Sequence, residues 1–294
     1  MCAPYRYLIC STRFLRISIQ ATKMKYLKST SSDLRELFER GITVRSIAES
    51  LSSFDEDCPA SHALSYMNEK NFDIIGVRQA GTVKGYAKRS RLSNEGKLAD
   101  YLDEQFKPEN VLGDAESLLN VFKALRNSPE STVFVSIFSQ VGGIVTRGDL
   151  QKAPVRMWLF GLISLIEMQM LRIIREFYPG DSWQRLISNG RFVKVQELLS
   201  DRQKRNVDID LADCLQFSDK RDILLKDKEL WGRIWFESKG TLKDFLNELV
   251  HLRDELAHAQ DIITGRWPEI VDIAERAESL LQRCEEISSV SQNT

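Results

Sequence analysis

The sequence lacks the residue patterns that several large classes of enzyme require. It has only three histidines, and its five cysteines are scattered with no CxxC pair, so no zinc-ligand spacing is present. It also contains no GxxxxGK(S/T) loop, which argues against a P-loop nucleotide hydrolase. A metal-dependent hydrolase or deaminase is therefore disfavoured, and no metal site is expected. Scattered cysteines are typical of reduced thiols in a cytoplasmic protein.

The chain also has little net charge. Its formal charge of −1 excludes a large basic field for non-specific binding of nucleic acid. This counts against a dedicated DNA-binding protein, but less against an enzyme that needs only a local basic cleft. The hydrophobic fraction of 43% predicts buried cores. The length of 294 residues predicts about two domains.

Residues 1–32 contain no acidic residue and six basic ones. The segment lacks the unbroken apolar stretch of a secretory signal, and it is interpreted either as a transit peptide or as the product of a start codon placed too early. The second interpretation, with Met24 as the true start, is preferred because fold-like patterning begins after Ser32. No structure is expected in this basic leader.

Between residues 33 and 152 one order of elements occurs twice. After short helices expected over 33–40 and 43–51, each unit has a helix, a strand, a turn and a return strand, which is an internal repeat. The two closing segments, residues 85–92 and 143–150, align with each other. The expected elements of the two units are helix 59–68 with strands 74–77 and 83–87, and helix 114–126 with strands 133–138 and 142–145.

The closing segments resemble those of cystathionine-β-synthase (CBS) domains, so a tandem CBS pair is expected over residues 33–152. Residues 143–150, Gly-Ile-Val-Thr-Arg-Gly-Asp-Leu, match the family's Gly-h-h-Thr-x-x-Asp segment, where h is apolar. The resemblance implies an adenine nucleotide (AMP, ADP or ATP) as a regulatory ligand, with Asp149 on the ribose hydroxyls and Thr146 on a phosphate. Alternatively, these two residues are only an N-cap and an acid in the first turn of a helix.

The first copy departs from this pattern. Lys88 stands where Thr146 aligns, and Arg91 stands where Asp149 aligns. The two cations are candidates for binding phosphates or RNA, or they form a solvated helix start. Ribose binding by the first copy is not expected.

From residue 153 onward the sequence predicts helices alone. The first is strongly apolar, but its unbroken apolar part is too short to span a membrane, so it is interpreted as a core or dimer helix with no membrane partner. Thr241 is the predicted N-cap of the fifth helix. The expected helices cover residues 155–177, 191–205, 209–217, 222–230, 242–263 and 268–287.

Residues 253–258 are Arg-Asp-Glu-Leu-Ala-His, and the Arg, the Asp and the His lie off the apolar stripe of the predicted helix. RNA can be cut without a metal if a histidine moves a proton and an arginine stabilises the charge on the phosphate. Asp254 and His258 are spaced so that the carboxylate can hold the imidazole. Arg253 and His258 lie about 140° apart around a helix, so a cleft between two copies suits them better than one chain does. The alternative is a solvated helix face.

This spacing resembles the Arg-x(4–6)-His signature of HEPN domains, which are small α-helical bundles. Many of them are metal-independent ribonucleases that act as dimers. The resemblance covers about residues 155–288 and implies Glu167 as a further site residue, unless it only pairs with Arg172 or Arg175. The expected fold class is therefore α+β, with a CBS pair followed by an all-α, HEPN-like bundle over 153–290.

Two functions stay open. The first is an endoribonuclease with a composite site at a homodimer interface and no cofactor for catalysis, regulated by an adenine nucleotide. Such an enzyme suits a stress or anti-phage toxin with an unidentified antitoxin. The second is a non-catalytic nucleotide-sensing and dimerisation protein. In either case a ligand regulates the protein only by favouring one arrangement over another.

Overall fold

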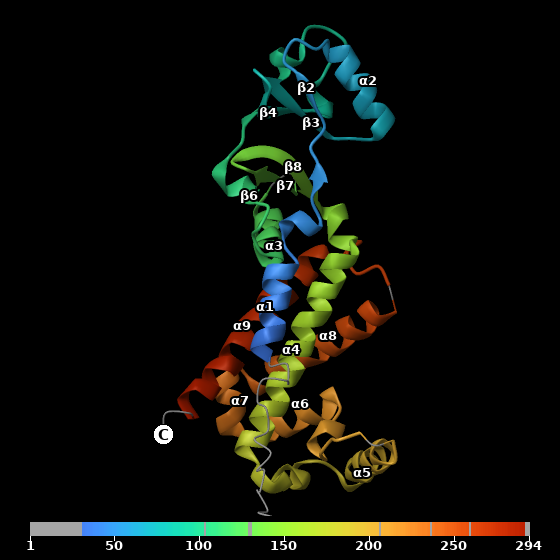
Figure 1. The fold of residues 1–294 in the computed structure, drawn as a ribbon, viewed down its shortest axis with the longest axis vertical. Helices are drawn as coiled ribbons and strands as arrows, with labels where there is room; N and C mark the ends of the chain where they lie inside the picture. Colours follow the sequence, from blue (N-terminus) through green and yellow to red (C-terminus); the bar gives the residue numbers. More distant parts are fainter. Residues whose placement is uncertain are drawn as a thin grey trace, which may run out of the picture. The chain divides into compact units, whose positions relative to one another are not determined.

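The computed structural model describes residues 31–291, except positions 103, 129, 130, 206, 236 and 259. Nearly all of the basic leader, with the question of its true start, lies outside the described residues. In the described part, two small sheets lie between residues 49 and 146, and helices alone follow residue 153 (Figure 1). The predicted α+β fold class is therefore confirmed.

One sheet is a hairpin with a short strand added at each edge, in the order β2-β3-β4-β5. β3 and β4 are antiparallel, β2 is parallel to β3, and β5 is antiparallel to β4. Apolar side chains of α2 and of the hairpin form a small separate core. The elements are β2 (Ser53–Asp55), α2 (Ala60–Lys70), β3 (Ile74–Gln79), β4 (Thr82–Lys88) and β5 (Glu104–Gln105).

The other sheet repeats this plan in the order β1-β8-β7-β6. Its hairpin β7–β8 takes β6 in parallel and β1 in antiparallel pairing. The register shifts after Val135 in β7, as it does after Val77 in β3, so the predicted repeat extends to this irregularity. The elements are β1 (Glu49–Ser50), β6 (Val111–Gly113), α3 (Leu118–Asn127), β7 (Thr132–Ile137), β8 (Gln140–Thr146) and the 3-10 helix η6 (Arg147–Gln151).

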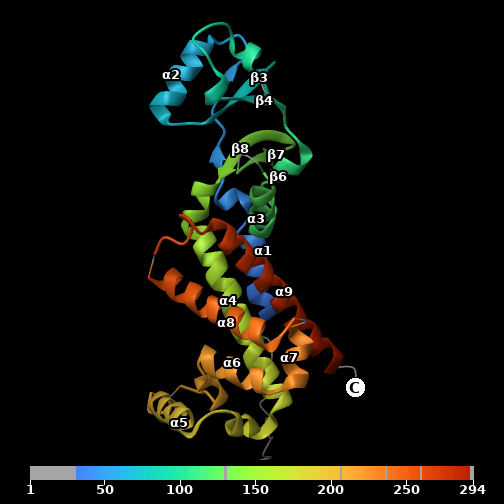
Figure 2. The ribbon, with the colours of Figure 1, turned by 180° about the vertical axis from the view of Figure 1, so that it is seen from behind.

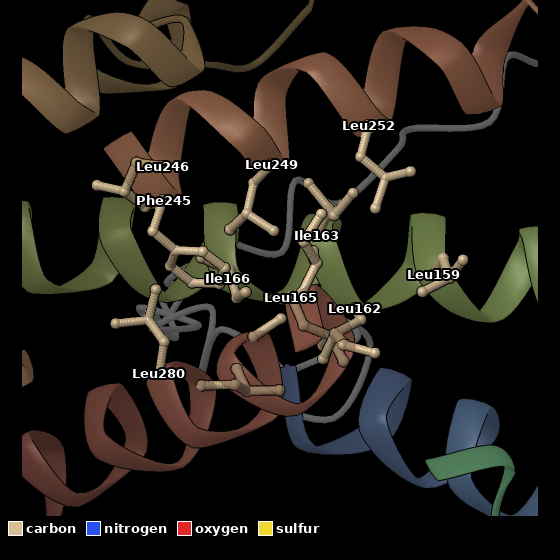
Figure 3. Close-up of a cluster of buried hydrophobic side chains, with 14 of the residues drawn as sticks. Leu159, Leu162, Ile163, Leu165, Ile166, Phe245, Leu246, Leu249, Leu252 and Leu280 are labelled. Atoms are coloured by element: carbon tan, nitrogen blue, oxygen red, sulfur yellow. The ribbon is translucent and has the colours of Figure 1, made fainter. Parts of the chain in front are cut away.

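The helical part is arranged around α4. This helix contacts α1, α6, α8 and α9, which Figures 1 and 2 show from opposite sides. In Figure 3, Leu249 and Leu252 of α8 and Leu280 of α9 reach α4 from two sides. The elements are α1 (Ser31–Gly41), α4 (Ala153–Phe177), η7 (Pro179–Leu186), α5 (Asn189–Gln203), η8 (Ala212–Cys214), α6 (Phe217–Lys226), α7 (Lys228–Ile234), α8 (Lys239–Ala257) and α9 (Trp267–Ser291).

Several predicted boundaries are wrong. The helix expected over 43–51 is the short η2 (Val44–Ser46) followed by β1. The pieces expected over 209–217 and 222–230 are η8, α6 and α7. The helix expected to start at residue 114 begins at Leu118, because the Ser117 hydroxyl accepts the Asn120 amide and caps it.

The motif helix α8 also differs from the prediction at both ends. Ser238, not Thr241, is its N-cap, and the Ser238 hydroxyl accepts the Thr241 amide. The helix ends at Ala257 rather than at residue 263. The Arg156 guanidinium explains that end, because it donates to the carbonyls of Leu256 (2.8 Å) and Gln260 (2.7 Å), on either side of the stop.

The sequence argument considered only the unbroken apolar part of α4, whereas the whole helix meets the length and composition of a membrane span. It has 25 residues, and among the described helices it alone is long and apolar enough to cross a membrane. An 18-residue window has a mean hydropathy of 1.6, and 61% of that window is buried in the protein. Because the core helix of a soluble protein meets the same criteria, this is weak evidence for a membrane span.

α1 packs against α4 and α9, although it precedes the repeat in sequence. Arg35 forms ion pairs with Glu278 and Glu285 of α9. Gly161 of α4 makes the close approach possible, since a Cβ atom at this position would overlap the Phe38 ring.

We predict that Gly161→Ala destabilises the protein by about 1–2 kcal/mol. Alanine gains about 1 kcal/mol of helix propensity, but its Cβ would overlap Phe38 ring atoms, so the overpacking cost should fall in the upper part of the usual range, about 2–3 kcal/mol. Gly232→Ala, in α7, is the matched control, because a Cβ there meets nothing within 4 Å. It should stabilise by about 0.5–1 kcal/mol. Urea denaturation measures both, and a Gly161→Ala protein as stable as the wild type would disprove the close packing.

Candidate functional site

Both copies of the repeat line one cleft of about 1080 Å³, here called the inter-repeat cleft. The first copy contributes residues around the start of β3 and the end of β4, including Lys88. The second copy contributes residues around the start of β7 and the end of β8, including Thr146, and Asp149 of η6. The structure thus brings three of the four predicted nucleotide-binding residues together. The fourth, Arg91, is exposed at the end of the short helix η3 (Arg89–Arg91) and is not among the lining residues.

Asp149 is tied into the local fold. Its residue is 7% exposed, and its Oδ2 accepts the Thr146 amide (2.7 Å) and the Thr146 hydroxyl (2.9 Å). Its Oδ1 pairs with the Lys152 ammonium at 2.8 Å. A carboxylate has about four acceptor positions, so this one can accept a further donor. Thr146 and Asp149 therefore do form the predicted N-cap, but the Asp149 carboxylate keeps one free acceptor position for a ligand.

Lys152 joins this side of the cleft to β1 and to the start of α4. Its ammonium donates to the Ile47 carbonyl (2.6 Å) and also pairs with Glu49. Burial acts to lower the pKa of Lys152, but the hydrogen bonds to Asp149 and Glu49 outweigh it, and the pKa is raised. The lysine therefore stays charged.

The cations of the cleft have different partners. Arg89 is held by Asp73 and by the Asn71 amide oxygen (3.1 Å). Lys88 lies 5.9 Å from the centre of the Tyr86 ring. Arg147, which the sequence analysis passed over, is exposed, with its guanidinium carbon 4.4 Å from the centre of the Trp267 ring in α9. The signal that could have found Arg147 is its place directly after the motif threonine.

Ser131 is a second lining residue that sequence reasoning missed. It has φ of +51°, it is 7% exposed, and its hydroxyl oxygen has no hydrogen-bond partner among the described residues. Nothing in the sequence distinguishes it from Ser128, whose hydroxyl accepts the Thr132 amide at 3.3 Å.

A second cluster of predicted residues lies on the helical part. Glu167 of α4 pairs with Lys220 of α6 at 2.8 Å and lies 3.9 Å from the guanidinium of Arg253. Lys220 is only 5% exposed, and no sequence signal pointed to it because it fell between two predicted helices. The Asp254 carboxylate accepts from Arg253 at 3.3 Å. Glu167, Arg253 and Asp254 are therefore close together.

The alternative partners of Glu167 are engaged elsewhere. Arg172 pairs with Glu176 at 3.4 Å, and Arg175 pairs with Asp210 and Asp213, both at 2.7 Å. The alternative in which Glu167 only pairs with Arg172 or Arg175 is therefore wrong, since its ion-pair partners are Lys220 and Arg253.

His258 stands apart from this cluster. It is the exposed residue directly after α8, and its backbone amide donates to the Asp254 carbonyl at 3.1 Å. Within the described residues, no hydrogen bond or ion pair joins its imidazole to Arg253, Asp254 or Glu167. The expected hold of Asp254 on the imidazole is thus replaced by a contact with Arg253. The helix ends at this point, so the side chain of His258 is not fixed by a helical turn.

No family model and no curated protein matches the sequence. Part of the chain is similar to solved CBS structures. A CBS-pair protein from Arabidopsis thaliana has 17% identity, covering 39% of this chain and 95% of that one, with a TM-score of 0.33. A CBS-domain protein of unknown function from Bacillus anthracis has 18% identity, covering 40% and 94%, with a TM-score of 0.33.

The CBS domain of a bacterial CNNM/CorC-family Mg²⁺ transporter, solved in complex with ATP, has 14% identity, covering 42% of this chain and 94% of that one, with a TM-score of 0.33. About two fifths of the chain therefore matches CBS-pair structures. Identities and TM-scores this low carry neither a ligand nor an activity over to this protein.

We predict that Glu167 and Lys220 stabilise the fold as a pair. Glu167→Gln leaves a buried ammonium without its counter-charge and should cost about 1–3 kcal/mol, reduced because the carboxylate side chain is 28% exposed. Adding Lys220→Met should restore most of this loss. A double-mutant cycle from urea denaturation measures the coupling, which should be about 1 kcal/mol or more.

Arg253→Gln is the control for this cycle, since its contact with Glu167 is longer, at 3.9 Å. We expect it to change stability by less than about 0.5 kcal/mol. Additive effects of Glu167→Gln and Lys220→Met would show that the pair does not stabilise the fold.

Proposed function

We propose that the protein is a nucleotide sensor that binds an adenine nucleotide in the inter-repeat cleft. The observation that carries this proposal is the meeting of Thr146, Asp149 and Lys88, from both copies of the repeat, in one cleft. Ligand sites of drug-sized molecules measure about 300–1,000 Å³, so the cleft is large enough. Its lining combines the Asp149 carboxylate for ribose hydroxyls with the Lys88 ammonium for phosphate.

The hydrogen bonds of Asp149 suggest how the ligand binds. Ribose offers two hydroxyl donors, whereas the carboxylate already accepts the Thr146 amide, the Thr146 hydroxyl and Lys152. A second ribose hydroxyl would therefore replace the Thr146 hydroxyl. The released hydroxyl would then be available to donate to a phosphate oxygen. Lys88, on the opposite copy, supplies positive charge to the same group.

We predict that AMP, ADP or ATP raises the melting temperature of the wild-type protein. A ligand at about 100 times its Kd adds about 2.7 kcal/mol of stability to the folded state. Asp149→Asn keeps an oxygen for the cap but weakens the acceptor for ribose, so we expect about tenfold weaker binding. Calorimetric titration measures the affinities, and scanning fluorimetry measures the melting temperature.

Asp100→Asn is the matched control for this prediction. Asp100 accepts the Lys97 amide at 2.8 Å in a capping box like that of Asp149, but it does not line the cleft. It should lose stability without losing affinity. Absence of any shift with all three nucleotides at millimolar concentration would overturn the proposed function.

A second candidate function is metal-independent cleavage of RNA at Arg253 and His258. The observation that favours it is the contact of the Arg253 guanidinium with Glu167. The exposed His258 follows Arg253 by five residues in the sequence. Arg253 would stabilise the phosphate charge, and His258 would move the proton. In a homodimer, Arg253 and His258 from the two copies could meet in one cleft. Met157 and Phe160 of α4 are 59% and 43% exposed, and a second copy packed on them would bury this apolar face.

We predict that the wild-type protein cuts total RNA in the presence of EDTA, alone or after addition of an adenine nucleotide. Arg253→Ala and His258→Ala should each lower the cleavage rate by about 100-fold or more, the range of one electrostatic or acid–base group. Light scattering should show that both variants keep the mass of a dimer.

His251→Ala is the control, because His251 is an exposed histidine on the same helix outside the motif. It should cut RNA at the wild-type rate. Cleavage that survives both motif substitutions would remove Arg253 and His258 from the site. Intact RNA under every condition would leave only the sensor function.

A further inference from the structure

The short helix η6 lies between the inter-repeat cleft and the loop that joins α8 to α9. Arg147 and Asp149 of η6 line the cleft. Gln151, at its other end, donates to the Asp261 carboxylate in the loop. Arg147 also reaches Trp267, the first residue of α9. One short element therefore contacts both regions.

Arg147 differs from the other arginine that lines the cleft. Arg89 already has a carboxylate partner in Asp73. The positive charge of Arg147 instead faces an aromatic ring, and within the described part of the chain no carboxylate pairs with it. A guanidinium on a partly exposed ring is attracted less strongly than one that makes two parallel hydrogen bonds to a phosphate. An anion in the cleft would therefore compete successfully for Arg147.

We infer that Arg147 binds the anionic group of a ligand in the inter-repeat cleft, together with Lys88, and that a phosphate on the ligand draws the Arg147 guanidinium away from Trp267. This inference rests on the proposed nucleotide binding and specifies a phosphorylated ligand over the bare nucleoside. Ribose contacts then come from Asp149, and a charge that recognises phosphate comes from Arg147, two residues earlier in the same short helix.

The loop keeps its own anchors when this contact is lost. The Asp261 carboxylate accepts the amides of Ile263 and Thr264, both at 2.9 Å. Arg156 holds the carbonyls of Leu256 and Gln260. Loss of the ring contact therefore alters the surroundings of Trp267 without unfolding the loop that begins at His258.

The test compares adenosine, AMP and ATP on the full chain by calorimetric titration. In Arg147→Gln, AMP and ATP should bind about 5- to 30-fold more weakly than in the wild type, because the variant loses one charge-assisted contact but has no ring contact to give up. Adenosine should bind both proteins equally. Arg89→Gln is the matched control and should change AMP affinity by less than about threefold, because its charge is already paired.

Tryptophan fluorescence tests whether the Arg147 guanidinium leaves the Trp267 ring when a phosphorylated ligand binds. AMP should change the emission of the wild-type protein, adenosine should not, and the AMP-induced change should vanish in Trp267→Phe. Equal AMP affinity of Arg147→Gln and wild type would overturn the inference and leave the proposed function standing. An AMP-bound protein with unchanged emission would overturn the release from Trp267. Failure of all three probes to bind the wild type would overturn both proposals.

Discussion

The burial of α4 is the constraint on which the rest of the helical part depends. An 18-residue window with a mean hydropathy of 1.6 is too apolar to leave mainly in water, and 61% of it is buried in the protein. Helices α1, α6, α8 and α9 all contact it, so elements that are far apart in sequence meet on one helix. The same constraint fixes the cleft, because η6 is followed by Lys152 alone before α4 begins. The packing of α4 therefore fixes the backbone position of η6.

The charged groups on α4 show how such a helix tolerates polar residues. Glu167 has Lys220 as its partner, and Arg172 donates to the Cys284 carbonyl at 2.7 Å and to Gln169 at 2.6 Å. Each buried or half-buried charge thus has a compensating group, as burial requires. This pairing explains Glu167 without a catalytic role, and only its long contact with Arg253 connects it to the motif.

The repeat could be read from the sequence because its main features are local. The hairpin turns carry Gly81 or other residues with positive φ, and β3, β4, β7 and β8 are six or seven residues long. Strands β1, β2, β5 and β6 have two or three residues, which is too short for an alternating pattern, so the sequence missed them. Their existence depends on pairing with hairpins that lie far away in the chain.

In the candidate sites too, the features that are local in sequence could be predicted and those that depend on distant contacts could not. Thr146 and Asp149 lie within one motif, whereas their meeting with Lys88 follows from the repeat. The contacts of Arg147 with Trp267 and of Lys220 with Glu167 could not be predicted, because the partners come from distant helices. The end of α8 was missed for the same reason, since the arginine that satisfies its last carbonyls belongs to α4.

The size of the contact at Arg147 limits what a ligand in the cleft can do to the helical part. The ring contact of Arg147 is worth about 0.5–1 kcal/mol and a phosphate contact about 1.5–3 kcal/mol. The net free energy gained when Arg147 exchanges one for the other is therefore roughly 1–2 kcal/mol. That difference shifts an equilibrium about 5- to 30-fold. A switch from 1:99 to 99:1 needs about 5.5 kcal/mol. Through this contact alone, therefore, a nucleotide would adjust the loop that begins at His258 in a graded manner, and full control of a nuclease would require further differences between the two arrangements, such as a change at a dimer interface.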